Sequence, residues 1–336
     1  MEFMTGGRAE VRITLADVGK RVSVRRLTGG GAGEPAFTDA VGVLTSWDEG
    51  VLSITRRSGE AVRIDESSLV AAKVVPAEPA RRRGPAAGVR ELQEVAARGW
   101  PAIETERLGE WTLRAAGGFT RRANSALPLG DPGLPLDAAL EHVQQWYGER
   151  GLPAVIVVAT GRTDTDEVLA AELARRGWAD ERHTTVRIAA LAPLADASAD
   201  TARVLLAREP DADWFGLYNR TDEPTPEARK VLTGGPSVWF AKVPDADGGT
   251  AAIGRLVVDG RWAGFAAVEV APAQRRRGLA TLVMAALAER ALQEGASAAY
   301  LQVEADNAGA RALYDRLGFT DHHGYHYRRA LPGDAR

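Results

Sequence analysis

Residues 264–319 limit most strongly what this chain can fold into. They begin with an apolar alternating run at 265–270, which predicts a strand. A loop with three consecutive arginines and Gly278 follows, and apolar residues then recur at helical spacing from Leu279 to Leu287. The order of strand, basic glycine-containing loop and helix presents free backbone N–H groups and positive charge at a helix N-terminus. Such a turn suits the binding of a pyrophosphate, which arginines contact with bidentate hydrogen bonds.

Two short motifs lie in these residues. The first places Arg275 three residues before Gly278 and five before Ala280. The second contains Asn307, Ala310, Leu313, Tyr314, Gly318 and Phe319. The first resembles the acyl-CoA motif of the GNAT superfamily of N-acetyltransferases, which has Arg or Gln, then Gly, then Gly or Ala at this spacing, and the second resembles that superfamily's pattern of Asn, Ala, Leu-Tyr and Gly-Phe. The two motifs occur in order, with a strand pattern at 299–304 between them. The resemblance covers about residues 262–320 and implies a GNAT fold, in which helices flank a mixed central sheet.

Composition narrows the class of protein further. A length of 336 residues predicts about two to three domains, and 45% hydrophobic residues are enough for a sizeable core. The net charge of −3 provides no bulk attraction to nucleic acid or to an anionic membrane. The absence of cysteine excludes disulfides and thiolate chemistry. No apolar run approaches the ~18 residues of a membrane span, so we expect a soluble cytoplasmic protein without a membrane partner.

Residues 10–75 show the pattern of a small all-β domain. Five short strands are separated by glycine-bearing turns, which predicts an SH3-like β-barrel. It resembles the barrel that precedes the catalytic part of some actinobacterial GNAT proteins. We interpret its arginines as solvated strand faces, and contact with an acidic partner is the alternative. Residues 76–88 follow; they are rich in Pro, Ala, Gly and Arg and predict a linker.

Residues 89–192 predict an α/β segment. The expected helices are 89–98, 136–150 and 166–176, and the expected strands are 111–115, 119–125, 154–159 and 184–190. The sequence at 173–178 is similar to that at 313–319 when Gly177 is aligned with Gly318, but no Arg/Gly loop precedes it. The segment therefore resembles a degenerate N-terminal GNAT-like half that carries no cofactor. Convergent helix endings are the alternative explanation of this similarity.

Residues 193–336 predict the complete, catalytic GNAT domain. The expected helices are 200–208, 225–232, 277–294 and 308–317, and the expected strands are 238–242, 251–259, 262–270 and 299–304. The Asp259-Gly260 pair predicts a hairpin turn between two of these strands. A final β hairpin is expected at 320–329, around Gly324.

The resemblance implies acetyl-CoA as the co-substrate and assigns its contacts. The pyrophosphate is expected on the loop and helix start made by Arg275, Arg276, Arg277, Gly278, Leu279, Ala280 and Thr281. The backbone of Val268, Glu269 and Val270 is expected to pair with the pantetheine arm and to face the thioester. On the second motif, the expected contacts are Asn307, Ala310 and Tyr314. Asn307 is also a favoured N-cap residue, and the two roles are compatible.

Acetyl transfer to an amine requires that the leaving thiolate gain a proton. The resemblance makes Tyr314 the candidate acid for this step. Its place on one apolar helix face with Ala310, Leu313 and Leu317 is also typical of a core residue.

The amine must also lose a proton, and the candidate bases are Glu304 and Glu269. In bacterial enzymes that acetylate ribosomal protein N-termini, a Glu occupies the position that we match to Gln302. Glutamine cannot accept the proton, so that enzyme's base is not carried over. The alternatives are a water chain to bulk solvent and, for each glutamate, a plain surface ion pair.

Three of the five histidines lie close together in the sequence, at His322, His323 and His326. Imidazoles at these spacings do not share one face of a strand, and the chain has no cysteine, so we predict no metal site. The resemblance places the last hairpin near the substrate, which makes His322 or His326 a candidate to line its mouth.

The sequence thus predicts an acetyl-CoA-dependent N-acetyltransferase. The acceptor is expected to be a primary amine of a small molecule, an amino-acid derivative or a peptide or protein, attacked directly in a ternary complex. The resemblance implies that its pocket is walled by residues of about 195–235 and by the 89–192 half. The alternative is an acyl-CoA-binding sensor or adaptor whose barrel engages protein or nucleic acid.

Overall fold

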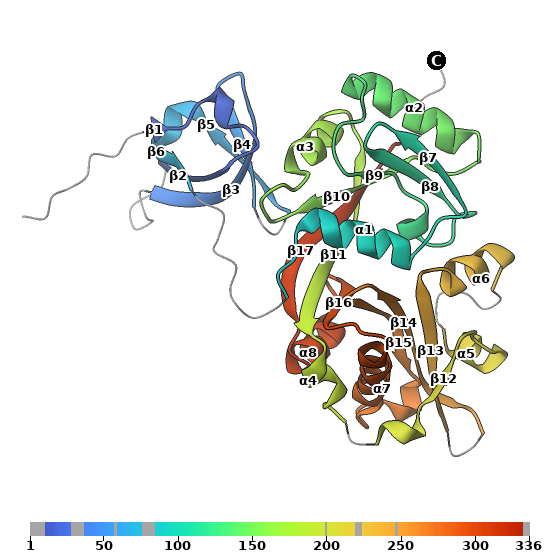
Figure 1. Cartoon of the computed structure of the whole chain (residues 1–336). Helices are drawn as coiled ribbons and strands as arrows, with labels where there is room; N and C mark the ends of the chain where they lie inside the picture. Colours follow the sequence, from blue (N-terminus) through green and yellow to red (C-terminus); the bar gives the residue numbers. More distant parts are fainter. Residues whose placement is uncertain are drawn as a thin grey trace, which may run out of the picture. The chain divides into compact units, whose positions relative to one another are not determined.

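The computed structural model describes residues 11–27, 37–56, 59–75, 85–198, 200–218, 224–245 and 248–331. Most of the predicted linker, 76–84, lies outside the described residues. Figure 1 labels the helices and strands of the chain. The chain divides into two compact units. The first comprises Met1–Ala80, Val158–Glu181 and His323–Arg336, and the second comprises Arg81–Val157 and Arg182–His322. None of the described helices has the length and apolar character needed to cross a membrane.

The N-terminal domain is one six-stranded sheet with the strand order β1-β6-β2-β3-β4-β5. Its strands are β1 (Val11–Arg12), β2 (Arg21–Leu27), β3 (Phe37–Asp48), β4 (Val51–Thr55), β5 (Ala61–Asp65) and β6 (Leu69–Val74). The long strand β3 pairs with β2 over its first half and with β4 over its second half, so it joins these two strands in one sheet. Its core includes Val24, Leu44 and Ile54, which are fully buried. The predicted small β domain is confirmed in kind, but strand β6 was not predicted.

Eight of the remaining strands form a large sheet with the order β10-β17-β11-β16-β15-β14-β13-β12. These strands are β10 (Val155–Thr160), β11 (Ala179–Ala190), β12 (Leu205–Ala207), β13 (Ser237–Pro244), β14 (Thr250–Asp259), β15 (Trp262–Val270), β16 (Ala298–Glu304) and β17 (Thr320–Arg329). Strand β15 runs parallel to β16, whereas β16 is antiparallel to β11. The predicted hairpin turn is present, because Asp259 of β14 faces Trp262 of β15 across Gly260.

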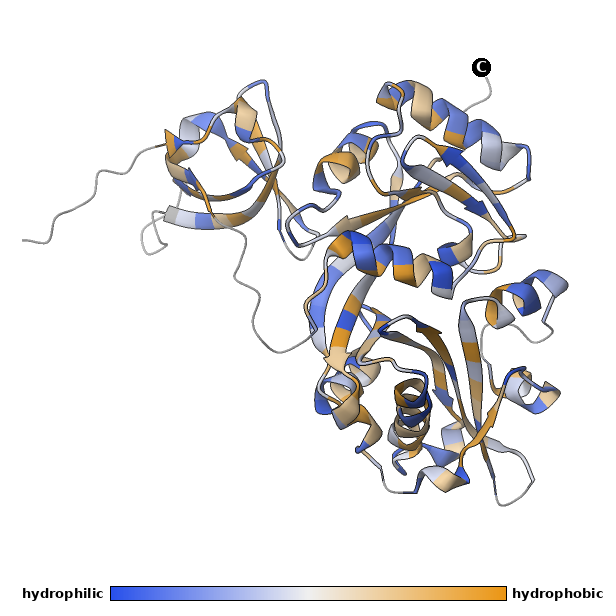
Figure 2. Cartoon of the chain, viewed as in Figure 1, coloured by the Kyte–Doolittle hydropathy of each residue, from blue (hydrophilic) through white to orange (hydrophobic). Residues whose placement is uncertain are grey.

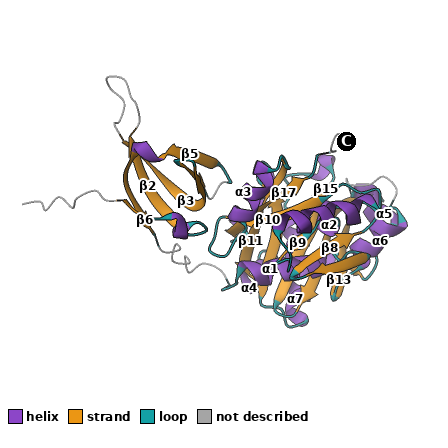
Figure 3. Cartoon of the chain, turned by 90° about the horizontal axis from the view of Figure 1, so that it is seen from above, coloured by secondary structure: helices purple, strands orange, loops and turns teal. Residues whose placement is uncertain are grey.

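A third sheet, of three strands, and eight α-helices complete the described chain. The small sheet contains β7 (Glu104–Leu108), β8 (Trp111–Ala115) and β9 (Leu127–Pro128). The helices, shown in purple in Figure 3, are α1 (Val89–Gly99), α2 (Leu136–Gly148), α3 (Glu167–Arg175), α4 (Ala192–Ala195), α5 (Ala212–Leu217), α6 (Pro226–Thr233), α7 (Leu279–Gln293) and α8 (Ala308–Arg316).

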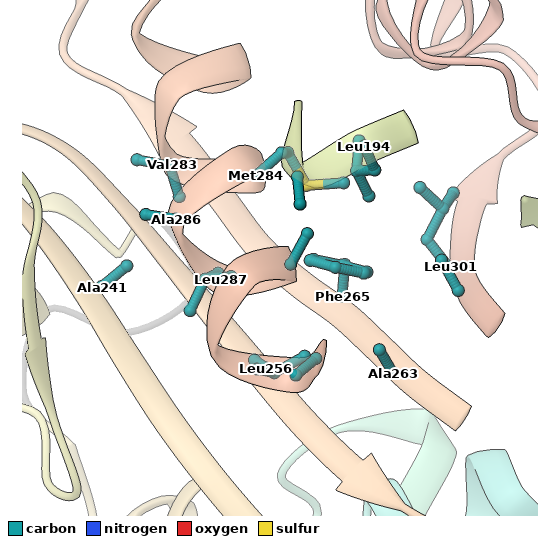
Figure 4. Packing of buried hydrophobic residues seen from close by; sticks show 14 of the residues in the cluster. Leu194, Ala241, Leu256, Ala263, Phe265, Val283, Met284, Ala286, Leu287 and Leu301 are labelled. Carbon is teal, nitrogen blue, oxygen red and sulfur yellow. The ribbon is translucent and has the colours of Figure 1, made fainter. Parts of the chain in front are cut away.

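The central strands carry apolar side chains on both faces, as expected for strands covered on two sides. On one face, α7 and α4 pack against them, and Figure 4 shows Met284 and Leu287 of α7 near Phe265 of β15. On the other face, residues of α5 and α6 form a second cluster with Trp100 and with the alternate positions of β13 and β14. Figure 2 shows the resulting concentration of hydrophobic residues along these strands. Two separate clusters, one on each face, therefore fix the sheet that carries the candidate site.

Three predicted elements are wrong. Residues 200–208 were expected to be a helix, but they form a 3-10 turn at Thr201–Arg203 and the edge strand β12, which pairs with β13. Residues 119–125 were expected to be a strand, but they form a loop closed by Asn124, whose side chain accepts hydrogen bonds from the N–H groups of Ala116 and Gly118. Residues 320–329 were expected to be a hairpin, but β17 is one continuous strand because it lies between β10 and β11 in the sheet.

Candidate active site

Strands β15 and β16 separate in the middle of the sheet. Within the described residues their parallel pairing joins 262–265 to 298–301 and then stops. Both strands nevertheless continue, β15 to Val270 and β16 to Glu304. The two strands thus present backbone edges that no longer bond to each other, which is an arrangement that can accept an extended ligand between them.

A β-bulge marks the point of separation on β15. Ala266 pairs with Arg255 of β14 and Glu269 pairs with Ile253, so Ala267 and Val268 together oppose the single residue Gly254. Ala267 has a φ of 50°, a left-handed conformation that costs a non-glycine residue about 1 kcal/mol or more. At Gly254, a Cβ would lie 2.5 Å from Val283 Cγ1, so α7 approaches the strand where only glycine fits. Backbone strain of this kind is concentrated at functional sites.

The Arg/Gly loop leads directly from β15 to α7. Gly278 is the N-cap residue of α7 with a φ of 77°, and Arg276 is also left-handed, with a φ of 60°. The first backbone N–H groups of a helix have no partner within that helix, so those that follow Gly278 are available to an anion. A Cβ built on Gly278 meets no protein atom within 4 Å, which shows that the space above this turn is open.

The loop side chains are partly held in place. Gln274 Nε2 donates to Asp245 Oδ2 at 2.7 Å, and Arg277 in turn donates to the Gln274 side-chain oxygen. Arg275 Nε donates to the Val270 carbonyl at 3.4 Å. All three arginines remain exposed, so positive charge surrounds the helix N-terminus. The predicted pyrophosphate residues are therefore brought together in one turn.

Helix α8 carries the second motif next to the end of β16. Asn307 caps this helix, because its side-chain oxygen accepts the Ala310 N–H at 3.0 Å. Tyr314 packs against the α7 cluster and meets the Phe319 ring edge-on, with 5.7 Å between centroids, yet it stays partly exposed. Among the described residues, none hydrogen-bonds to its hydroxyl. Desolvation raises the pKa of Tyr314 to about 12, against the opposing charge of Arg187, so the phenol is protonated at neutral pH.

The two candidate bases lie on the strand ends. Glu304 of β16 is partly exposed and its Oε1 lies 3.5 Å from Arg182 Nη1 in an ion pair. Glu269 is also partly exposed, and Val268 and Val270 on either side of it pack against the α7 cluster. Neighbours along a strand point to opposite faces, so Glu269 points away from that cluster.

A cavity of about 50 Å³ lies beside the bulge, on the face of the sheet opposite α7. It is lined by Gly99, Trp100, Arg122, Tyr218, Arg255, Val257, Gly264, Phe265, Ala266, Ala267, Tyr300 and Gln302. Neither candidate base is among these residues, whereas Gln302 is. The lining draws on 195–235 through Tyr218 and on the 89–192 half through Trp100 and Arg122.

Arg255 is the most unusual residue of this lining. Its side chain is 1% exposed, and it donates from Nε to the Leu232 carbonyl at 2.7 Å and from Nη2 to the Gly234 carbonyl at 3.0 Å. Its guanidinium carbon lies 4.6 Å from the centre of the Trp100 ring. Burial lowers the pKa of Arg255 to about 10, which still leaves it charged at neutral pH.

The sequence analysis did not identify Arg255 or the aromatic residues around it. A signal was present, because a single arginine interrupts the apolar run 251–258, and charged residues are rarely buried in such strands.

His322 and His326 were the candidates to line the mouth of the substrate site. His322 is 2% exposed, and its Nε2 lies 3.0 Å from the Ala87 carbonyl oxygen. Neither His322 nor His326 is among the residues that line the cavity.

Comparison with known proteins covers nearly the whole chain. The family described as "Probable histone acetyltransferase Rv0428c C-terminal" matches residues 86–328, and "Rv0428c N-terminal Sm-like domain" matches residues 16–73. The probable histone acetyltransferase Rv0428c of Mycobacterium tuberculosis is 30% identical over 324 residues, which is 94% of this chain and 96% of that protein. The uncharacterized N-acetyltransferase YobR of Bacillus subtilis is 30% identical over 258 residues, covering 71% of this chain and 98% of YobR. A mycothiol acetyltransferase of Clavibacter michiganensis is 31% identical over 234 residues, covering 57% of this chain and 75% of that protein.

Solved structures resemble this chain in fold. A GCN5-related N-acetyltransferase from Kribbella flavida has a TM-score of 0.55 at 17% identity, covering 74% of this chain and 98% of its own. A tandem GNAT protein from the clavulanic acid biosynthesis pathway has a TM-score of 0.52 at 19% identity, covering 76% of this chain and 92% of its own. These likenesses concern the fold alone, and they confirm the predicted mixed sheet with flanking helices. The N-terminal domain, predicted as SH3-like, matches a family described as Sm-like.

Proposed function

Because this chain belongs to the GNAT family of N-acetyltransferases represented by Rv0428c, we propose that it transfers the acetyl group of acetyl-CoA to a primary amine by direct attack in a ternary complex. The observation that carries the proposal is the continuous path from the bulge at Ala267, along the separated strand end 268–270, to the Arg/Gly turn at Gly278. A thioester, a pantetheine arm and a pyrophosphate follow one another in acetyl-CoA in the same order.

The proposed contacts of acetyl-CoA follow from this path. The N–H groups at the start of α7 and the arginines 275–277 would bind the pyrophosphate. The backbone of 268–270 would pair with the pantetheine arm, and the N-terminal end of α8 at Asn307 and Ala310 would lie along it. The acetyl group would then lie at the bulge, next to the cavity on the other face of the sheet.

The chemical steps require one bond to form and one to break. The neutral amine nitrogen attacks the thioester carbonyl carbon, and the negative charge that develops on the oxygen is stabilised by backbone N–H groups near the bulge. The carbon–sulfur bond then breaks, and Tyr314 donates its proton to the leaving thiolate. The phenol is protonated at neutral pH and therefore has a proton to donate; its pKa of about 12, raised by desolvation, makes it a weak acid that gives up this proton only to a strong base such as the leaving thiolate. The amine proton leaves through Glu304, Glu269 or water.

Thiol release tests the proposal. Acetyl-CoA is mixed with the protein and with each member of a panel of amino acids, small amines, polyamines and peptides, and free CoA thiol is measured. We expect release that depends on both the protein and an amine, since the relatives include acetyltransferases named for histone and for mycothiol. Binding of acetyl-CoA without release for any amine would favour the sensor alternative instead.

The stoichiometry of acetyl-CoA binding provides a second prediction. We propose that the half at 89–192 binds no cofactor, because it has no Arg/Gly loop and Leu173, which is fully buried, stands where the resemblance would place the phenol. Calorimetric titration of the full chain with acetyl-CoA is expected to give one site per chain. Two sites per chain would contradict a degenerate first half.

A further inference from the structure

The cavity beside the bulge contains a buried positive charge with no acid to match it. Arg255 is 1% exposed, and among the described residues no carboxylate lies within ion-pair distance of its guanidinium. Its partners are the carbonyl oxygens at the end of α6, whose dipoles offset only part of the charge, and the face of Trp100. Buried charges in proteins are normally paired, because desolvation makes an isolated one costly. A missing counter-ion at a cavity wall points to a ligand that supplies it.

The rest of the wall favours the same kind of ligand. Of the described residues that line the cavity, none is acidic, and four carry N–H or O–H donors on charged or phenolic groups: Arg122, Arg255, Tyr218 and Tyr300. Arg122 lies over the same Trp100 ring, 5.5 Å from its centre, so two guanidinium groups share one aromatic side chain. Burial raises the pKa of Tyr300, which therefore remains a neutral donor. A wall of donors around a guanidinium suits an anion, and the planar guanidinium matches a carboxylate in particular.

The position of Arg255 relates this wall to the reaction. Arg255 of β14 and Ala266 of β15 are register partners, and the next residue is the strained Ala267 of the bulge. Ala266 and Ala267 line the same cavity of about 50 Å³. A ligand whose anionic group meets Arg255 and whose amine meets the bulge would therefore occupy one small cavity. A short separation between its anion and its amine fits that space.

From this geometry we infer that the acceptor is a small amino acid or amino-acid derivative whose carboxylate binds Arg255 and whose amine lies at the bulge. The inference rests on the proposed acetyl transfer and specifies the acceptor of that same site. It separates this chain's substrate class from plain amines and from peptide amines, neither of which presents a carboxylate next to the reacting nitrogen.

Matched acceptor pairs test the inference in the wild-type chain. Each amino acid of the panel is compared with its own carboxamide, and kcat/KM is measured for both by thiol release. The carboxamide has the less basic amine, so without a carboxylate site it would react faster at neutral pH. We expect the amino acid to be preferred by about tenfold or more, the effect of a charge-assisted hydrogen bond to the buried guanidinium.

Two variants assign that preference to Arg255. In Arg255→Met the ratio of kcat/KM for the amino acid to kcat/KM for its carboxamide is expected to fall to about one or below, mainly because KM for the amino acid rises. In Arg255→Lys part of the wild-type ratio is expected to remain. Arg290→Met is the matched control, because Arg290 also stacks on a tryptophan, Trp239 at 4.2 Å, and is not among the cavity residues. Its preference is expected to equal that of the wild type.

The outcomes separate this inference from the proposed function. Thiol release with plain amines or peptides but no preference for the carboxylate in the wild type would overturn the inference and leave acetyl transfer intact. No release with any amine would contradict the proposed function itself. If the Arg255 variants fail to fold, the wild-type preference alone decides, and a ratio near one overturns the inference.

Discussion

Replacing Gly278 with leucine is expected to weaken acetyl-CoA binding by about a hundredfold, the effect of losing two charge-assisted hydrogen bonds. The side chain would extend into the open space above the turn, where the pyrophosphate approaches the N–H groups of α7. The left-handed φ of 77° adds a stability cost of about 1–2 kcal/mol, because leucine adopts that conformation with difficulty. Calorimetry with acetyl-CoA measures the affinity, and thermal unfolding measures the cost in stability.

Gly295 provides the matched control at the other end of the same helix. It has a φ of 90°, and a Cβ built on it also meets no protein atom within 4 Å. Gly295→Leu should therefore lose a similar amount of stability while acetyl-CoA affinity stays at the wild-type value. Equal affinities in the Gly278 variant and the wild type would show that the pyrophosphate does not bind at this turn.

Tyr314→Phe is expected to lower the turnover rate by ~10² or more, the range for a lost general acid. The change removes one hydroxyl and keeps the ring, so the packing against Phe319 and the α7 cluster should persist. Thermal stability and acetyl-CoA affinity should change little, because the hydroxyl acts mostly as the thiolate leaves. The three measurements on one variant are turnover, melting temperature and affinity.

Tyr147→Phe is the control for loss of a tyrosine hydroxyl. Tyr147 is fully buried and its hydroxyl donates to the Arg114 carbonyl oxygen at 3.0 Å, so its removal breaks a buried hydrogen bond. This variant should lose stability and keep its turnover rate. Turnover of Tyr314→Phe within about twofold of the wild type would instead make Tyr314 a core residue, with the proton supplied by water.

The sequence predicted the fold best where local pattern and family motif agree. Helix α7 was expected at 277–294 and is Leu279–Gln293, and α8 was expected at 308–317 and is Ala308–Arg316. The errors arose where long-range pairing decides the conformation. Residues 205–207 carry no strong strand pattern and become the edge strand β12 only because β13 offers a partner. Gly324 suggested a turn, but its place inside the sheet keeps β17 extended.

The candidate site shows the same limit. The Arg/Gly turn and Tyr314 lie in contiguous motifs, so the sequence alone was enough to propose them as candidates. The bulge at Ala267 could not be predicted, since it depends on the register of β15 against β14. The environment of Arg255 combines Trp100, at the end of α1, with carbonyl groups at the end of α6, which only the folded chain brings together. No local pattern encodes that combination.

The central claim is that this chain moves an acetyl group from acetyl-CoA to a primary amine. Mass spectrometry of the acceptor after incubation with the full chain and acetyl-CoA tests it most directly, with free CoA thiol measured in the same sample. We expect the acceptor to gain the mass of one acetyl group on its nitrogen, in an amount equal to the thiol released. Thiol release without an acetylated amine, or an acceptor of unchanged mass throughout the panel, would contradict the claim.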